Sequence, residues 1–237
     1  KDVCPLWINY IGVDFVQGKG VDVILDDPYK LPFADNSLDF VVCSSCFEHS
    51  QFFWLVFLEV MRVLKPTGLF YLNAPSNGFF HRYPVDCWRF YPDSGGAMVA
   101  WAERNGYQPE LMESFIGDRS AGCVADGGMW NDFVAVFVKD KQYSKQYSKR
   151  IINQIGTYHS GYNSQTGVNS NINDLGPDFE LIQLLESQNK RLTNQLITLN
   201  ESVINLNKYI ASVEVEKDTI INLNKLVSHL EIESQQL

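Results

Sequence analysis

The chain has 237 residues, enough for one globular domain of about 150 to 200 residues and an additional segment. Its 28 acidic side chains outnumber its 19 lysines and arginines, and the net charge of −9 disfavours non-specific binding to nucleic acid. Five cysteines, an odd number at irregular spacing, argue against a disulfide framework. The sequence shows neither a secretory leader nor an apolar run long enough to span a bilayer, so we expect a cytoplasmic protein that is not inserted in a membrane.

Three short apolar runs near the start of the chain predict buried parallel strands. They cover residues 10–14, 21–25 and 40–43, are rich in β-branched side chains and are bounded by turn residues. Gly18 and Gly20 imitate the glycine spacing of a cofactor-binding loop, but such a loop leads into a helix, and here a strand pattern follows. We therefore expect a turn between the first two strands.

The next part of the chain alternates helical and strand patterns. Helices are predicted over residues 51–64 and 95–105. Residues 74–93 form an aromatic and basic loop that is too long to be a mere connection. The alternation of strands and helices predicts an α/β fold with a parallel sheet and helices on its faces. Further strands are predicted over residues 69–73, 111–116 and 133–138.

The remaining residues divide into two segments of different character. Residues 140–177 are rich in Ser, Asn, Gln, Gly and Tyr, which predicts a flexible linker after an α/β domain over residues 1–139. Residues 178–237 instead carry an unbroken seven-residue repeat with apolar side chains at most a and d positions. The d positions are Leu185, Leu192, Leu199, Leu206, Val213, Ile220 and Val227, and the a positions are Ile182, Asn189, Leu196, Val203, Ile210, Lys217 and Asn224.

This repeat predicts a left-handed, two-stranded parallel coiled coil. We expect a homodimer through residues 182–230, in which Asn189 and Asn224 hydrogen-bond across the pair and fix its register. The alternative is a single amphipathic helix packed on its own domain, which would show a wider apolar stripe than the a and d positions alone.

A set of motifs in the first 140 residues follows a distinctive order. The second strand leads into Asp26 and Asp27, and the segment Leu31-Pro32-Phe33 follows. A further strand, the helix ending in Leu64-Lys65-Pro66-Thr67-Gly68, and the strand over residues 69–73 come next. Over residues 8–138 the chain resembles class I S-adenosylmethionine-dependent methyltransferases, in the branch with an Asp-x-x-x-Leu-Pro-Phe signature. The resemblance implies a Rossmann-like sheet, S-adenosylmethionine as cofactor and methyl transfer to an acceptor.

The resemblance also assigns residues to the cofactor. It implies that Asp14 holds the ribose hydroxyls, which suits a carboxylate because it can accept a hydrogen bond from each. It implies that Asp27, with Asp26 beside it, reaches the adenine amine. Leu31 and Ser44 are the other expected cofactor residues, Ser44 lying near the methionine portion. The alternative for Asp14 and Asp27 is a role as helix caps or turn residues.

One part of the family pattern is missing from this sequence. The family's first strand and glycine-rich loop should precede residue 10, yet only nine residues stand there and none is glycine. We expect a sheet that lacks its first strand, which leaves unpaired backbone groups and an exposed apolar edge. The chain is then either a fragment or a degenerate copy, and we expect it to bind the cofactor weakly or not at all by itself.

The acceptor side is expected around two loops. Catalytic candidates are His49, His81 and Asp86, since methyl transfer needs a positioned acceptor and, in some cases, a base. Arg82 and Arg89 suggest an acceptor with a phosphate or carboxylate group, although pairing with Asp86 is the alternative. The remaining substrate candidates are Tyr83 and Trp88, and the resemblance suggests a glycan or sugar-derived small molecule as acceptor.

No metal site is expected from the cysteines. Cys43 and Cys46 supply only two ligands, and no second pair stands at ligand spacing. A different class of function also fits the sequence, namely a catalytically silent methyltransferase-like docking module that is dimerised by the coiled coil.

Overall fold

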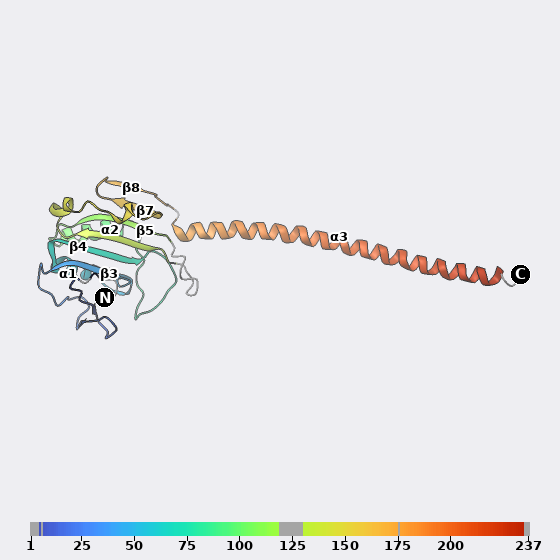
Figure 1. The fold of residues 1–237 in the computed structure, drawn as a ribbon, viewed down its shortest axis with the longest axis horizontal. Coiled ribbons are helices and arrows are strands. Elements are labelled where there is room, and N and C mark those ends of the chain that lie inside the picture. Colours follow the sequence, from blue (N-terminus) through green and yellow to red (C-terminus); the bar gives the residue numbers. More distant parts are fainter. Residues whose placement is uncertain (1–4, 6, 119–129, 175, 235–237) are drawn as a thin grey trace. The chain divides into compact units, whose positions relative to one another are not determined.

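A computed structural model describes residues 5, 7–118, 130–174 and 176–234 (Figure 1). The chain divides into two compact units, residues 1–177 and residues 178–237. The first unit is a mixed α/β domain, and the second is one long helix. Residues 235–237 of the predicted coiled coil lie outside the described residues.

The first unit is built on a six-stranded sheet in which β3 and β4 are the only parallel neighbours among the described strands. The other neighbours are antiparallel. Within this sheet, the prediction of parallel strands is therefore right for β3 and β4 and wrong for the other neighbouring pairs. Residues 164–167 join β7 directly to β8, a connection that only antiparallel strands permit. The strand order is β3 (Leu38–Ser44), β4 (Leu64–Pro75), β6 (Asp132–Val138), β5 (Glu110–Gly117), β7 (Tyr158–Asn163) and β8 (Val168–Ser170).

The first two predicted strands form a separate parallel pair, β1 (Val13–Asp14) and β2 (Val23–Ile24). The Gly12 carbonyl accepts hydrogen bonds from the backbone N–H groups of residues 22 and 23, at 2.8 and 3.0 Å. A Cβ on Gly12 would lie only 1.8 Å from the carbonyl oxygen of Gly20, so glycine is required at position 12. The expected turn between the strands is confirmed, and no helix separates them.

In the described part of the chain, β3 forms an edge of the large sheet and β1–β2 does not join it. Phe40 and Val42 on β3 are 52% and 57% exposed, which is unusual for side chains of this type on a strand.

The core lies between the sheet and two helices, α1 (Phe53–Val63) and α2 (Ser94–Arg104). Both helices fall within two residues of the predicted bounds. On α1, Phe57 and Met61 are fully buried because their spacing places them on one helix face. They belong to the same cluster as Phe70 of β4 and Phe137 of β6, whose rings stack with their centroids 5.8 Å apart.

The prediction of a flexible linker over residues 140–177 is wrong, because this stretch belongs to the first unit. It contains two 3-10 helices, η3 (Lys141–Gln146) and η4 (Ile151–Asn153), and then β7 and β8. Ile152 is buried against Phe115 and Val134 in a second, smaller cluster.

Polar anchors hold this stretch in place. The buried Arg150 donates from Nε to the Met112 carbonyl at 3.1 Å and from Nη1 to the Tyr147 carbonyl at 2.7 Å. The buried Glu113 carboxylate accepts from the backbone N–H groups of residues 151 and 152, at 2.9 and 2.8 Å. Hydrogen bonds from side chains to the backbone leave no periodic apolar pattern in a sequence. The composition of this stretch therefore suggested a flexible linker.

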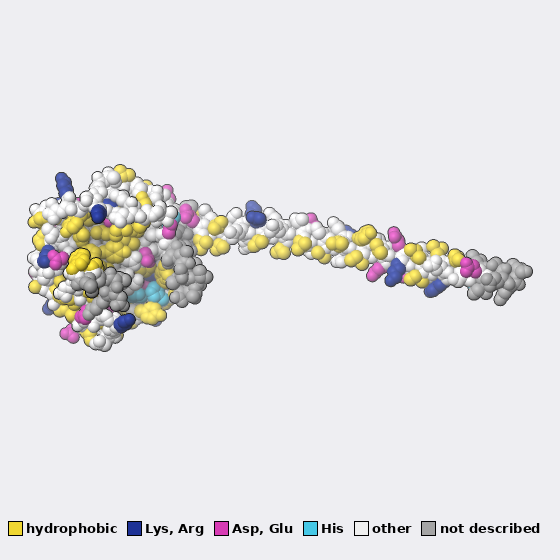
Figure 2. Space-filling view, viewed as in Figure 1, with side chains coloured by type: hydrophobic (Ala, Val, Ile, Leu, Met, Phe, Trp, Pro, Cys, Tyr) yellow, Lys and Arg dark blue, Asp and Glu magenta, His cyan; other side chains and the backbone are white. Residues whose placement is uncertain are grey.

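The second unit is helix α3 (Pro177–Ser234), 58 residues long. Such a helix is about 87 Å long at 1.5 Å per residue. Apolar side chains recur along it and are exposed, for example Leu199 at 61% and Leu206 at 58% (Figure 2). Among the described helices, α3 included, none is both long and apolar enough for a membrane crossing.

Candidate functional site

The candidate site is built from two loops that follow parallel strands. The first loop leaves β3 and contains the short 3-10 helix η1 (Phe47–His49), and the second, residues 76–93, leaves β4. Because β3 and β4 are parallel neighbours, their carboxyl ends meet at the same edge of the sheet, which is where open α/β sheets bind ligands. The predicted catalytic residues all lie in these two loops.

Three side chains converge there. Glu48, His49 and His81 each present one potential ligand atom, and these atoms lie within 4.8 Å of one another. His49 Nε2 is 3.7 Å from Glu48 Oε1, and the two imidazole rings meet edge to face with centroids 4.9 Å apart. The sequence predicted both histidines. It did not predict a role for Glu48, whose only signal was its place beside His49.

Glu48 is the least solvated member of this group. The residue is 1% exposed, and its Oε2 accepts no hydrogen bond from the residues that the structure describes. Burial raises the pKa of the Glu48 carboxyl, and the positive charges of His49, His81 and Arg89 offset only part of that effect.

Both histidines are oriented through Nδ1. His49 Nδ1 lies 2.5 Å from the Val85 carbonyl oxygen, so it carries a proton and donates it. His81 Nδ1 lies 3.4 Å from Asp86 Oδ2. Nε2 of His49 lies on the side of the ring that is next to Glu48, 3.7 Å from Oε1.

Asp86 is held in a dense set of contacts. Its carboxylate receives Arg89 Nη1 at 2.5 Å, Arg89 Nη2 at 2.8 Å and the backbone N–H of His81 at 2.8 Å. The hydrogen bonds from Arg89 lower the pKa of Asp86 to about 2, so this carboxylate is ionised. Asp86 therefore positions His81, and it is not free to act as a base.

The predicted substrate residues separate into two kinds. Trp88 donates from Nε1 to the Ser50 carbonyl at 2.8 Å and packs against Phe53 and Trp54, and Arg89 pairs with Asp86, so both have structural roles. Arg82 and Tyr83 are exposed, Tyr83 at 75%. The Tyr83 ring centroid lies 6.4 Å from that of His49, so Tyr83 is available to a ligand beside the histidines.

Trp130, which the sequence did not suggest, packs against this group. Its ring centroid is 5.0 Å from that of His81, and the Arg89 guanidinium carbon lies 5.5 Å from it. Gly78 accommodates the indole, because a Cβ there would lie 2.2 Å from the Trp130 ring. No local pattern could have revealed a contact between positions so far apart in the chain.

The two carboxylates expected at the cofactor lie at the same end of neighbouring parallel strands. Asp14 ends β1, and Asp27 follows β2; both are exposed. Asp14 Oδ1 accepts from the Val16 N–H at 3.0 Å, and Asp27 Oδ1 accepts from the Tyr29 N–H at 2.9 Å. These are the turn contacts that the sequence offered as the alternative, and each uses one oxygen of its carboxylate.

The other cofactor candidates have different surroundings. Asp26 is exposed, and Ser44 donates to Asn73 Oδ1 at 3.3 Å at the end of β3.

The charge of Asp14 also affects the pKa of Cys46, in the loop after β3. A hydrogen bond with Cys43 lowers the pKa of Cys46, while burial and the charges of Glu48 and Asp14 oppose that shift.

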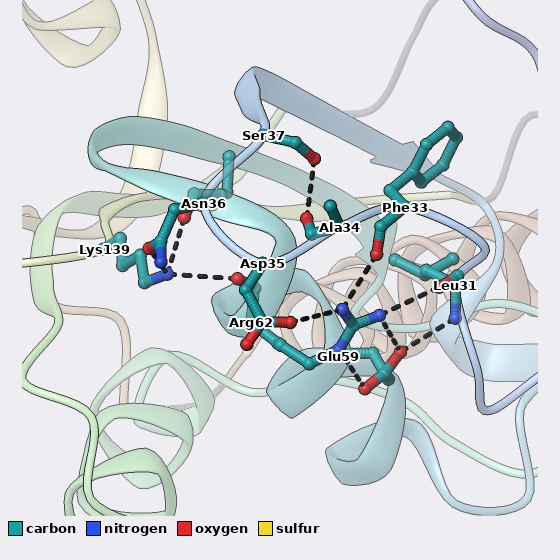
Figure 3. Close-up of polar contacts among 10 residues, drawn as sticks. Leu31, Phe33, Ala34, Asp35, Asn36, Ser37, Glu59, Arg62 and Lys139 are labelled. Atoms are coloured by element: carbon teal, nitrogen blue, oxygen red, sulfur yellow. Dashed lines mark hydrogen bonds and ion pairs between the residues drawn. The ribbon is translucent and has the colours of Figure 1, made fainter.

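Helix α1 holds the loop that carries Leu31 (Figure 3). Arg62 donates to the carbonyls of Leu31 and Phe33, both at 2.8 Å, and to Asp35 Oδ1 at 2.7 Å. Glu59 accepts from Arg62 and from the Leu31 N–H at 2.8 Å. Glu59 and Arg62 are three residues apart on α1, and together they fix this loop.

A groove of about 370 Å³ lies elsewhere in the first unit. None of the predicted cofactor, catalytic or substrate residues lines it. Its lining comes mainly from the anchored stretch, with Met112, Glu113, Gln146, Tyr147, Ser148, Lys149 and Arg150 beside Leu69 and Val136.

A known protein family matches the N-terminal part of the chain, which includes the strands β1, β2 and β3. The family described as "Methyltransferase domain" matches residues 7–72. This segment is methyltransferase-like. It contains β1, β2, β3, α1 and most of β4, and it therefore includes Asp14, Asp27 and the loop with Glu48 and His49.

Two curated relatives from Arabidopsis thaliana match a similar length. "Probable methyltransferase PMT19" is 34% identical over 76 residues, 31% of this chain, and "Probable methyltransferase PMT21" is 34% identical over 74 residues, 30% of this chain. In each case the match spans 12% of the relative's own length.

Solved structures show a looser likeness. One is the 1,6-didemethyltoxoflavin-N1-methyltransferase from Burkholderia thailandensis, with 14% identity, a TM-score of 0.39, and coverage of 54% of this chain and 60% of that one. Another is a SAM dependent methyltransferase from Aquifex aeolicus, with 18% identity, a TM-score of 0.32, and coverage of 51% and 56%.

Proposed function

We propose that this chain contributes to S-adenosylmethionine-dependent methylation of a small-molecule acceptor, in the methyltransferase branch with the Asp-x-x-x-Leu-Pro-Phe signature. The observation that carries the proposal is the match of residues 7–72 to a methyltransferase domain. That segment contains the two carboxylates and the loop over the carboxyl end of β3.

The residues present fit the adenosine part of the cofactor. Asp14 and Asp27 stand at the same end of two paired parallel strands, and each keeps one carboxylate oxygen outside its turn hydrogen bond. A carboxylate accepts well from ribose hydroxyls and from an exocyclic amine. Leu31, which Arg62 and Glu59 hold in place, and Ser44 complete the set.

When bound, S-adenosylmethionine would supply a methyl group on a sulfonium; the acceptor atom forms a bond to that methyl carbon while the carbon–sulfur bond breaks in line and the neutral thioether leaves. The chain's own contribution is to position that acceptor and to manage its proton. His49 and His81 each have a ring nitrogen within 4.8 Å of the other's, and Asp86 accepts a hydrogen bond from the His81 backbone N–H. Arg82 and Tyr83 lie exposed next to them and suit an anionic or sugar-derived acceptor.

The proposed weak cofactor affinity follows from the open edge of β3. We expect this chain to bind S-adenosylmethionine with a dissociation constant well above the low-micromolar range, because no described strand pairs with the outer edge of β3. The proposed coiled-coil dimer through residues 182–230 and residence in the cytoplasm are separate proposals, and they rest on the heptads and on the cysteines.

The direct test is calorimetric titration of the full chain with S-adenosylmethionine at millimolar concentrations. We expect measurable binding that Asp14→Asn and Asp27→Asn each abolish. Asp39→Asn is the matched control, since Asp39 is an exposed carboxylate on β3 that pairs with Lys65. Equal affinity in the Asp14 variant and the wild type would contradict the ribose assignment, and low-micromolar affinity would contradict the expected weakness.

A further inference from the structure

We propose that Glu48, His49 and His81 bind one divalent transition-metal ion of the zinc type. The three residues come from η1, after β3, and from the loop after β4, so two parallel strands bring them to one place. This proposal does not depend on methyl transfer. With the ion bound, the two histidines act as ligands rather than as proton acceptors.

The spacing of the ligand atoms is close to that of a metal site. Two ligands at about 2.1 Å from a tetrahedral metal ion lie roughly 3.4 Å apart. His49 Nε2 and Glu48 Oε1 are already 3.7 Å apart, and all three ligand atoms lie within 4.8 Å of one another. Small side-chain rotations, chiefly of the half-buried His81, bring the set to coordination distance.

The surroundings of the histidines match those of metal ligands. A histidine that binds metal through one nitrogen usually donates the other N–H to a carbonyl or carboxylate, which fixes the ring. His49 Nδ1 has the Val85 carbonyl at 2.5 Å, and His81 Nδ1 has Asp86 at 3.4 Å. Asp86 is itself fixed by Arg89. The Phe79 carbonyl oxygen lies equally close to His81 Nδ1, at 3.4 Å.

The buried carboxylate of Glu48 is a second, independent observation that points to a bound cation. Its side chain is 2% exposed, and Oε2 makes no hydrogen bond to the described residues. A buried carboxylate oxygen without a partner is costly, and bound cations are one of the few groups that relieve that cost. The carboxylate and the lone pair of His49 Nε2 also repel each other unless a proton or a cation lies between them.

The ligand types indicate the class of metal. Two imidazoles and one carboxylate suit zinc and neighbouring transition metals, whereas magnesium and calcium prefer oxygen ligands. Three protein ligands leave a fourth position open for water or for a ligand oxygen. The exposed Tyr83 lies beside this position, through its ring contacts with both histidines.

The nearby thiols offer a different site for the same metal, and the test must separate the two. Cys43 and Cys46 are free thiols, and the hydrogen bond between them raises the pKa of Cys43 and lowers that of Cys46. Thiolate ligands give cobalt a strong near-ultraviolet charge-transfer band that nitrogen and oxygen ligands do not.

The experiment uses the full chain after treatment with a chelator. Zn²⁺ is titrated calorimetrically, and Co²⁺ is titrated by visible absorption. We expect one ion per chain and no thiolate band. Glu48→Gln and His81→Ala should each weaken binding beyond the roughly 10- to 100-fold that is typical of losing an outer-shell partner, and Asp86→Asn should weaken it within that range. Zn²⁺ should raise the melting temperature of the wild type, and it should not raise that of Glu48→Gln or His81→Ala.

Two control variants are expected to bind like the wild type. His159→Ala removes a histidine of β7 that pairs with Asp118, and Cys46→Ser removes a thiol near the site. Should Glu48→Gln fail to fold, His81→Ala decides the matter, because His81 lies in a loop and its side chain is 21% exposed. The proposal is overturned if metal binding is not saturable at one ion per chain, or if the control variants lose as much metal affinity as Glu48→Gln and His81→Ala do. A thiolate band that Cys46→Ser removes would also overturn it.

Discussion

At the scale of single residues, the ion pair between Asp86 and Arg89 determines how the loop after β4 is held. The Asp86 side chain is 1% exposed, and Arg89 reaches it with both terminal nitrogens while also donating to the Phe79 carbonyl. Removing one partner of such a pair leaves a buried charge, which costs about 3–5 kcal/mol.

We therefore predict that Arg89→Met lowers the free energy of unfolding by about 3–5 kcal/mol, measured by urea denaturation. Arg82→Met is the matched control, because Arg82 is exposed in the same loop, and it should change that free energy by no more than about 0.5 kcal/mol. Similar losses in the two variants would contradict a specific role for the Asp86–Arg89 pair.

The same pair predicts a dependence on pH. Arg89 lowers the pKa of Asp86 from 3.8 to about 2 in the folded protein. Because the folded value lies below the unfolded one, the stabilisation is complete above about pH 4 and is lost as the pH falls toward 2, roughly 2 kcal/mol in all. The stability difference between the wild type and Arg89→Met should narrow over this window. A difference that stays constant from pH 5 to about pH 2.5 would contradict this assignment.

Glu48 predicts a pH dependence of the opposite sign. Burial raises the pKa of its carboxyl, so the folded state binds that proton more tightly than the unfolded state does. Stability therefore falls as the pH rises through the unfolded pKa toward the folded one. In metal-free protein, Glu48→Gln should raise the melting temperature more at pH 8 than at pH 4. An equal effect at both pH values would show that the carboxyl titrates as it does in the unfolded chain.

At the scale of elements, residues 141–170, from η3 to β8, were expected to be a flexible linker but are anchored in the first unit. Arg150 is 4% exposed and bonds to the carbonyls of Met112 and Tyr147. We predict that Arg150→Met makes residues 141–170 susceptible to limited trypsin digestion under conditions in which the wild type resists it. Lys149→Met, which changes the neighbouring exposed cation, should leave the wild-type resistance unchanged. Equal digestion of wild type and Arg150→Met would contradict the anchoring role.

The elements that the sequence predicted well are those with strong local patterns. The helical periodicity over residues 51–64 and the apolar run over residues 69–73 correspond to α1 and to the centre of β4. The anchored stretch was missed because Arg150 and Glu113 hold it through hydrogen bonds to distant backbone, which leave no periodic trace.

The candidate site was predictable only in part for the same reason. The order of motifs pointed to His49, His81 and Asp86, and the structure brings these residues together. It could not indicate that Glu48 is buried with an unpaired oxygen, or that Trp130 covers His81. Such facts depend on the packing of loops whose sequences carry little periodicity.

At the scale of the whole molecule, the chain combines an α/β unit that has an open sheet edge with a helix that has exposed apolar positions. Phe40 and Val42 on β3 and the leucines of α3 are exposed in the single chain. Clustered exposed apolar side chains usually mark an interaction surface. For α3 we propose a second copy of this chain as the partner, since it would present the same a and d positions in register.

We predict that the full chain sediments with twice the 27.0 kDa mass of one chain at tens of micromolar. Leu199→Glu together with Leu206→Glu should give a monomer, because each places a charge in the seam where an exposed leucine would otherwise be buried. Lys208→Glu is the control, since position 208 is an f position outside the seam, and this variant should stay dimeric. A wild-type chain that sediments as a monomer at these concentrations, or a double variant that remains a dimer, would show that the repeat does not pair two helices.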